Sequence, residues 1–172
     1  ALVVGDLGFG VVERFSDRYP DRYVNAGVAE QDMVGLAAGM AMAGAVSFTY
    51  SIVNFSVLRC LEQIRNDVCY HQANVKLVAV GGGLAYGALG VTHHGTEDLA
   101  ILRSLPEMRV IAPADPIESE WATRLAAETP GPFFLRLGRN GERRLHPEGA
   151  SLELGRAAYL RGGTDVTLIG IG

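Results

Sequence analysis

The fold of this chain is decided by one stretch, Asn25-Ala26-Gly27-Val28-Ala29-Glu30-Gln31-Asp32-Met33-Val34-Gly35-Leu36-Ala37-Ala38-Gly39-Met40-Ala41. A polar loop, with Asn25 as a candidate cap, leads into a helix so rich in Gly and Ala that it must pack closely on something. Glu30 stands in the first turn, where the helix dipole favours an anion. Glu30 therefore has two interpretations, a dipole-complementing acid or a functional carboxylate, and the rest of the chain must decide between them.

Composition limits the class of protein. The chain has 172 residues, of which 48% are hydrophobic and 20% charged, with a net charge of -4, enough for one well-formed core. No run of Lys or Arg indicates binding to nucleic acid or to an anionic membrane. Cys60 and Cys69 match neither a disulfide framework nor a zinc spacing. No signal peptide and no apolar stretch of ~20 residues is present, which predicts a soluble, cytoplasmic protein without membrane contact.

Outward from this stretch, apolar runs alternate with helical patterns. Strands are predicted at 1–4, 23–25, 45–50, 75–80, 108–112 and 133–137. Helices are predicted at 11–18, 30–43, 55–71, 97–105 and 116–128, with Pro116 suited to a first turn. This alternation predicts an α/β fold, a mostly parallel sheet with helices on both faces.

The ends of the chain differ in character from its centre. Residues 138–149 are polar and contain proline, as linkers do, and 165–170 are predicted to be a strand. We expect residues 1–140 to form one domain, and 141–172 to hold a linker and the first strand of another. The sequence is thus expected to be a piece of a larger polypeptide.

Polar residues cluster where strands of the predicted sheet end, which is where ligands bind in parallel sheets. Asp6 follows the first strand and is a cofactor contact or a turn former. Phe55 follows the third and stacks on a ligand or belongs to the core. Arg136 and Arg139 mark the last strand as anion ligands, with a structural ion pair as the alternative for Arg136.

His93 and His94 lie in the long Gly-rich loop after the fourth strand. They could be metal ligands, proton-transfer groups or plain loop residues, and no Cys or carboxylate recurs at metal-ligand spacing. We therefore favour proton transfer or substrate binding, with His93 as the better candidate. The run 81–83, Gly-Gly-Gly, lacks the P-loop and dinucleotide-binding patterns, and is predicted to let the backbone approach a ligand or a neighbouring chain.

Several of these motifs together resemble a known family. The stretch 28–39 resembles the signature of the pyrimidine-binding domain of transketolase-like, thiamine diphosphate-dependent enzymes, and Pro-Asp-Arg-Tyr at 20–23 fits it. Segment 90–100 is similar to the family's G-P-T-H region, followed in order by related motifs at 102–106 and 109–115. Segments 53–56 and 62–64 resemble beta subunits of 2-oxoacid dehydrogenases. The likeness covers residues 1 to 140.

The resemblance implies roles for individual residues. Glu30 would hydrogen-bond a ring nitrogen of the aminopyrimidine and favour the imino tautomer that deprotonates the thiazolium carbon. Phe55 would stack on the pyrimidine, and Asp6 would lie near the cofactor. His93 would contact substrate or intermediate, with His94 among the substrate-binding residues, and Arg139 would bind the substrate's phosphate.

Two departures from the family pattern concern the substrate. An acidic residue usual shortly before the loop histidine is replaced by Ala88 or Leu89, and a histidine at the preceding strand end is replaced by Gly81. Because both groups recognise sugar hydroxyls, the resemblance implies an anionic, sugar-like substrate with an unusual hydroxyl pattern. The spacing of Arg136 and Arg139 matches the R-x-P-R of deoxyxylulose-phosphate synthases.

The family's G-D-G motif, which holds the diphosphate and Mg²⁺, is missing from this sequence. The resemblance therefore implies a separate diphosphate-binding subunit or domain, a homodimer or heterotetramer, and a Gly/Ala-rich helix face packed against a partner chain. The implied activity is transfer of a two-carbon ketol unit between sugar phosphates. Alternatives are a 2-oxoacid dehydrogenase beta subunit, a deoxyxylulose-phosphate-synthase-like condensation, and an inactive scaffolding homologue.

Overall fold

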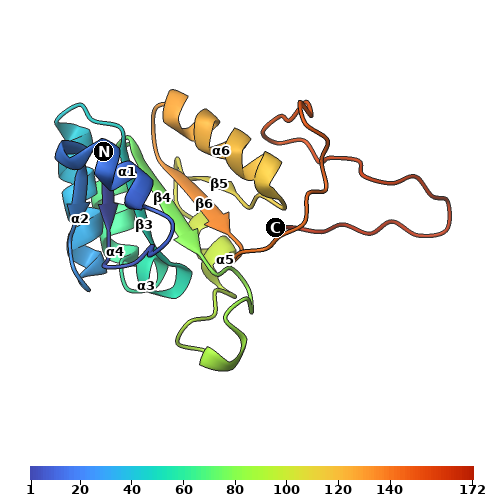
Figure 1. The fold of residues 1–172 in the computed structure, drawn as a ribbon, viewed down its shortest axis with the longest axis horizontal. Coiled ribbons are helices and arrows are strands. Elements are labelled where there is room, and N and C mark those ends of the chain that lie inside the picture. Colours follow the sequence, from blue (N-terminus) through green and yellow to red (C-terminus); the bar gives the residue numbers. More distant parts are fainter.

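The computed structural model describes residues 1–172 and contains a six-stranded, wholly parallel sheet with the order β2-β1-β3-β4-β6-β5 (Figure 1). Its strands are β1 (Leu2–Val4), β2 (Tyr23–Asn25), β3 (Ser47–Ile52), β4 (Val75–Val80), β5 (Arg109–Ile111) and β6 (Phe133–Leu137). The helices are α1 (Glu13–Arg18), α2 (Glu30–Met42), α3 (Val53–Val57), α4 (Leu61–Gln63), α5 (Asp98–Arg103) and α6 (Pro116–Glu128). Short 3-10 turns η1 (Pro20–Arg22) and η3 (Gly87–Leu89) and a π-helix η2 (Ile64–Cys69) complete the set.

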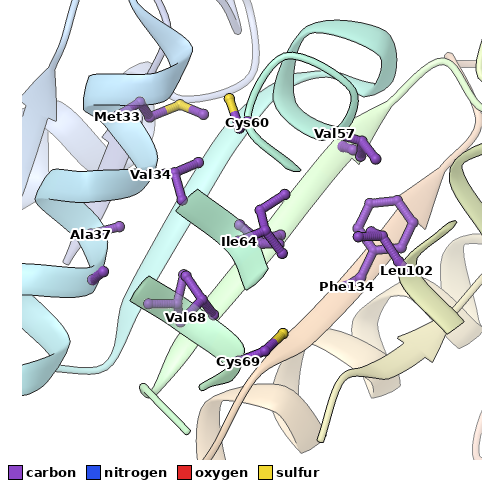
Figure 2. Packing of buried hydrophobic residues seen from close by; sticks show 14 of the residues in the cluster. Met33, Val34, Ala37, Val57, Cys60, Ile64, Val68, Cys69, Leu102 and Phe134 are labelled. Atoms are coloured by element: carbon purple, nitrogen blue, oxygen red, sulfur yellow. The ribbon is translucent and has the colours of Figure 1, made fainter. Parts of the chain in front are cut away.

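Helices cover both faces of the sheet, as predicted. A core of 17 buried residues lies between the sheet and α2, α3, η2 and α5 (Figure 2). A smaller core lies under α6, where Ala122 and Ala126 meet Phe133 and Leu135. Phe134, between these two strand residues, points into the larger core, which is the alternation that a strand buried on both faces requires.

Helix α2 has two contrasting sides. Met33, Val34, Ala37 and Ala38 are buried in the larger core. Gly35 and Gly39 face away, and a Cβ atom built on either would meet no atom within 4 Å. The outward side of this helix therefore has open space at two glycines, beside the exposed Leu36 and Met42.

The prediction that Asn25 caps α2 is wrong. The N-cap is Ala29, which makes no side-chain cap hydrogen bond. The Asn25 side chain is engaged elsewhere, because its Oδ1 accepts hydrogen bonds from the backbone N–H groups of Gly27 and Asp6. The amide thus shapes the loop between β2 and α2 instead of closing the helix.

The single helix predicted over 55–71 is also wrong. Helix α3 starts directly at the end of β3, and the chain leaves helical geometry at Cys60, with φ -104° and ψ 12°. It continues through α4 into η2, where Tyr70 N–H donates to Arg65 O five residues back. The π-helical turns of η2 still bury Ile64 and Val68, four residues apart, as a regular helix would. The spacing of apolar residues therefore did not reveal the break in the helix at Cys60.

Helix α6 matches its predicted range, with Asp115 as N-cap and Pro116 at the first position. Strands β2, β4 and β6 also match their predicted ranges, and the boundaries of the remaining strands and helices shift by at most two residues. On the sheet side of α6, the fully buried Lys76 donates from Nζ to Thr129 O at 2.8 Å and to Gly131 O at 2.5 Å. This lysine therefore binds carbonyls at the carboxyl end of α6, where a cation is favourable.

Residues 141–172 contain no helix or strand in this structure, and the division into a domain at 1–140 and a linker with the first strand of another at 141–172 stays a prediction. A strand needs a hydrogen-bonded neighbour, and this exposed segment has none beside it. One point of the tail is fixed, because Asp115 Oδ2 accepts hydrogen bonds from Leu145 N and His146 N, both at 2.8 Å. None of the helices has the length and apolar character of a membrane-spanning segment.

Candidate active site

The parallel sheet brings the sequence-predicted loops to one edge. Because every strand runs the same way, the carboxyl ends of β1, β3, β4 and β6 lie together. Asp6, Phe55, the loop from Gly81 to Gly95, and Arg139 all follow these ends, and α2 starts beside them.

Glu30 is the first residue of α2 and is 1% exposed. Its carboxyl lies beside β1 and β3, since a Cβ on Gly5 would stand 3.3 Å from Glu30 Cγ and 3.4 Å from Ser51 Oγ. Glu30 Oε2 accepts a hydrogen bond of 2.6 Å from Arg59 Nη1. Gly5 therefore provides the room in which this buried carboxylate lies.

Arg59 connects Glu30 to the aromatic part of the site. Its side chain is 48% exposed, and its Cζ lies 5.2 Å from the centroid of the Phe55 ring. The Phe55 ring in turn meets His93 edge-on, with centroids 5.1 Å apart. Phe55 lies outside the hydrophobic core clusters, and its ring contacts Arg59 and His93 instead.

His93 is held on the loop by its neighbours. Its Nδ1 lies 2.9 Å from Thr92 Oγ1, and Asn54 Nδ2 donates to Thr92 O at 2.6 Å. The Tyr86 ring also meets the His93 ring edge-on, with ring centroids 5.7 Å apart. Nε2 has no hydrogen-bond partner in the chain, so it is the nitrogen available to a ligand.

Arg139 joins the same group through Tyr86, since its Cζ lies 5.3 Å from the Tyr86 ring centroid. His94 does not join it. Its Nε2 lies 3.0 Å from Gly87 O, a contact that closes the loop on itself. Of the two adjacent histidines, the structure thus places His93 among the other predicted residues and gives His94 a contact within the loop.

Gly81 and Gly82 make room for side chains of this chain, while the approach of a ligand or a neighbouring chain that we predicted for the run 81–83 stays a prediction. A Cβ on Gly81, where φ is +87°, would overlap the Tyr86 ring, and a Cβ on Gly82 would meet Arg136 Nε. Arg136 forms an ion pair of 3.0 Å with Asp98 and donates to Gly95 O. The structural-pair alternative for Arg136 is therefore confirmed.

Asp6 lies at the same edge but apart from this group. It has a positive φ of 56°, and its Oδ1 accepts a hydrogen bond from Asn25 Nδ2 while its N–H donates to Asn25 Oδ1. This reciprocal pair joins the loops after β1 and β2. The cofactor contact predicted for Asp6 has no counterpart among the contacts of Glu30 and Phe55, so it stays a prediction.

Two residues of the site, Arg59 and Tyr86, were missed from the sequence. A signal for Arg59 exists, because it follows Phe55 by four residues, the spacing that places two side chains on one helix face. Tyr86 gives no such signal, since its partners His93, Arg139 and Gly81 are brought to it only by the folded loop.

The thiol nearest the site is inert. Burial, together with the negative charge of Glu30, raises the pKa of Cys60 to about 12. Burial also raises the pKa of Tyr86, against the opposing effect of Arg139. Both groups are therefore protonated at neutral pH, which excludes Cys60 as a nucleophile and leaves Tyr86 with a hydroxyl that donates.

The residues fit the pyrimidine end of thiamine diphosphate. A buried carboxylate and an aromatic face already hold one planar N–H donor, the guanidinium of Arg59, between them. An aminopyrimidine is likewise planar and carries N–H groups. For the diphosphate end, no cluster of His, Cys, Asp or Glu in this chain could hold a metal ion.

Comparison with known proteins agrees with this geometry. Residues 5–143 match the family model described as "Transketolase, pyrimidine binding domain". The chain belongs to the transketolase pyrimidine-binding domain family. Membership of this family implies dependence on thiamine diphosphate.

Relatives of this family domain include components of split enzymes. The chain is 40% identical over 159 residues to one of the subunits of the apulose-4-phosphate transketolase of Phocaeicola vulgatus, covering 92% of this chain and 51% of that protein. It is 41% identical over 160 residues to "Putative transketolase C-terminal section" of Methanocaldococcus jannaschii, covering 92% and 51%. The chain thus spans about half the length of the curated relatives it matches.

A solved structure supports the same fold assignment. The "Split gene transketolase, inactive beta4 tetramer" superimposes with a TM-score of 0.79 at 36% identity, covering 91% of this chain and 50% of that one. The predicted thiamine diphosphate-binding α/β fold of the pyrimidine domain is therefore confirmed.

Proposed function

We propose that this chain is the cofactor-activating part of a transketolase-like transferase. The reaction is transfer of a two-carbon ketol unit between sugar-phosphate-like substrates. The observation that carries the proposal is the buried Glu30 carboxylate at the start of α2, set against Gly5 and facing the aromatic edge formed by Phe55 and His93.

Thiamine diphosphate, when bound, supplies the nucleophilic carbon that such carbon–carbon bond cleavage needs. Glu30 Oε2 accepts a hydrogen bond from an N–H donor, as it does from Arg59, and in this role shares a proton with the ring. The Phe55 ring supplies a flat face for stacking. These two residues orient the pyrimidine and leave the substrate side to His93 and Arg139.

His93 and Arg139 have different roles toward the substrate. His93 Nε2, without a partner in the chain, holds or releases a proton at a substrate oxygen. Arg139 is exposed above the Tyr86 ring and binds the anionic end of the substrate. His94 serves substrate binding indirectly, because its contact with Gly87 O shapes the loop that carries His93.

A partner completes the site. We assign the diphosphate and Mg²⁺ to a diphosphate-binding subunit or domain, since no group of His, Cys, Asp or Glu in this chain could hold a metal ion. The outward stripe of Gly35 and Gly39 on α2 suits close packing against another chain, in a homodimer or heterotetramer. The solved relative is described as a beta4 tetramer.

The substrate is an anionic sugar. Arg139 supplies the cation, and a relative is named for apulose 4-phosphate, a sugar phosphate. The spacing of Arg136 and Arg139 keeps a deoxyxylulose-phosphate-synthase-like condensation as the second candidate. An assay that compares turnover with an aldose phosphate acceptor and with a lipoyl-domain acceptor separates these two candidate functions from that of a 2-oxoacid dehydrogenase.

Glu30→Gln in the assembled enzyme tests the proposal, with the exposed Glu128→Gln as matched control. The amide keeps the volume but holds no transferable proton, so we expect kcat to fall by about 100-fold or more. The control keeps wild-type turnover. Turnover of Glu30→Gln within a few-fold of wild type refutes the activating role, and complete inactivity of the wild-type assembly would favour a scaffolding homologue.

A further inference from the structure

We propose that Arg59 is a positioning residue for Glu30 and an internal competitor for the cofactor ring. Its guanidinium occupies the place between Glu30 and Phe55 that the aminopyrimidine takes, and cofactor binding displaces it. This inference rests on the proposed function, because it concerns the same carboxylate.

The first support is that one planar group makes both contacts. Arg59 Nη1 donates to Glu30 Oε2 at 2.6 Å, while the guanidinium carbon lies 5.2 Å from the Phe55 ring centroid. These are the two groups that we assign to the cofactor ring, a carboxyl group that hydrogen-bonds a ring nitrogen and an aromatic face on which the ring stacks. Arg59 uses both at once.

The second support is chemical likeness. A guanidinium is flat, delocalised, rich in N–H donors, and stacks on aromatic rings while it binds a carboxylate. An aminopyrimidine is also flat, carries N–H donors and stacks by its face. Because Glu30 Oε2 and the face of Phe55 are each engaged by Arg59, the two groups exclude one another.

The third support is the asymmetry of burial within the pair. The Glu30 side chain is 1% exposed, whereas that of Arg59 is 48% exposed. Arg59 also lies beyond α3, in the irregular turn before α4, between exposed Leu58 and buried Cys60. The arginine can therefore turn into solvent without any change in the core, while Glu30 stays in place.

The pair has two consequences. A buried carboxylate left without a partner is costly, so the ion pair with Arg59 holds the Glu30 side chain in one orientation at the start of α2. The apparent affinity for a ligand falls by the fraction of molecules in which the binding site is free. For a hydrogen bond between a guanidinium and a buried carboxylate, this fraction corresponds to a weakening of about tenfold.

The test measures thiamine diphosphate binding, with Mg²⁺ present, to the complex of this chain with its diphosphate-binding partner. Calorimetry gives the dissociation constant and stopped-flow mixing the association rate. Arg59→Met is expected to bind about tenfold more tightly and associate faster than wild type. Arg65→Met removes an exposed arginine of η2 whose side chain hydrogen-bonds only to Asn66, and this control is expected to match wild type.

Repeating the Arg59→Met substitution in the Glu30→Gln variant shows whether the change in affinity depends on the Glu30 carboxylate. In Glu30→Gln, where the carboxylate is absent, Arg59→Met is expected to change thiamine diphosphate affinity by less than twofold. Arg59→Gln is a second neutral variant, and it gives the same tightening if Arg59→Met fails to assemble with its partner.

The outcomes separate this inference from the proposed function. Arg59→Met or Arg59→Gln binding that equals or is weaker than wild type overturns the competitor role, while the loss of turnover in Glu30→Gln still supports the activating role. An equal gain in affinity in the Glu30→Gln background also overturns it. Failure of the wild-type complex to bind thiamine diphosphate overturns both.

Discussion

Replacing Gly81 by alanine tests how the substrate side of the site is built. Gly81 has φ +87°, and its missing side chain leaves the space that the Tyr86 ring fills. Tyr86 in turn contacts His93 and Arg139. One added methyl group should therefore strain the backbone and push the ring away from both substrate-side residues.

The cost can be divided into two parts. An L-residue with positive φ costs about 1–2 kcal/mol relative to glycine. Displacing Tyr86 forfeits an aromatic contact with His93 worth about 0.5–1.5 kcal/mol and an exposed cation–π contact with Arg139 worth about 0.5–1 kcal/mol. We expect Gly81→Ala to lower the free energy of unfolding by about 2–4.5 kcal/mol.

Gly87→Ala supplies the control for the backbone part. Gly87 lies in the same loop with φ +51°, and a Cβ there would meet nothing within 4 Å. Urea denaturation should show a loss of only about 1–2 kcal/mol for this variant. In a Tyr86→Ala background, Gly81→Ala should fall to the same value, because no ring remains to be displaced.

Two results would refute this reasoning. The first is equal destabilisation by Gly81→Ala and Gly87→Ala, which would mean that the ring yields without cost. The second is an undiminished effect of Gly81→Ala when Tyr86 is already alanine. In the assembled enzyme, Gly81→Ala should raise KM for the sugar substrate more than it lowers kcat, since the Glu30 side of the site is untouched.

Two further predictions concern stability and pH. Burial, aided by the charge of Arg109, lowers the pKa of Lys76 to about 8, so the unfolded chain binds more protons between pH 8 and 10.5. The free energy of unfolding should therefore rise across this window, and urea titrations should show this rise missing in Lys76→Met. Burial alone would raise the pKa of Asp115, but hydrogen bonds from backbone N–H groups, including those of Leu145 and His146, outweigh burial and hold this pKa below the ordinary 3.8. The stability that ionised Asp115 contributes is therefore lost as the pH falls below 3.8. Asp115→Asn should cost about 2 kcal/mol at pH 7 and expose 145–146 to proteolysis, and a wild-type cleavage rate would contradict the contact.

Elements that carry their own boundary signals were predictable from the sequence. Helix α6 begins after Asp115 with Pro116 at its first position, and strand β4 is a buried β-branched run that ends in glycine. The break near Cys60 was not predictable, because the apolar spacing through η2 resembles a regular helix. Asn25 was misassigned since its amide binds a neighbouring loop that only the fold brings close.

The candidate site divides in the same way. Phe55 and His93 were predictable as neighbours, because parallel topology sends the loops after β3 and β4 to one edge of the sheet. The role of the glycines at 81–83 was not, since it depends on Tyr86 and Arg136, which reach these positions through tertiary contacts. Local pattern thus locates the loops, and side-chain packing decides what each loop does.

Glu30 shows how far periodicity alone can reach. Counting along α2, Glu30 precedes the buried Met33, Val34, Ala37 and Ala38 by three, four, seven and eight residues, so it occupies the first position of the apolar stripe. A carboxylate in that position must be buried if the helix packs as its pattern requires. Burial of a charge is costly unless the charge is paired, and a helix that needed only a dipole-complementing acid could have placed it on the outer face, as Asp32 is placed. The position of Glu30 on the stripe, rather than its place in the first turn, is therefore what separates a functional carboxylate from a capping acid.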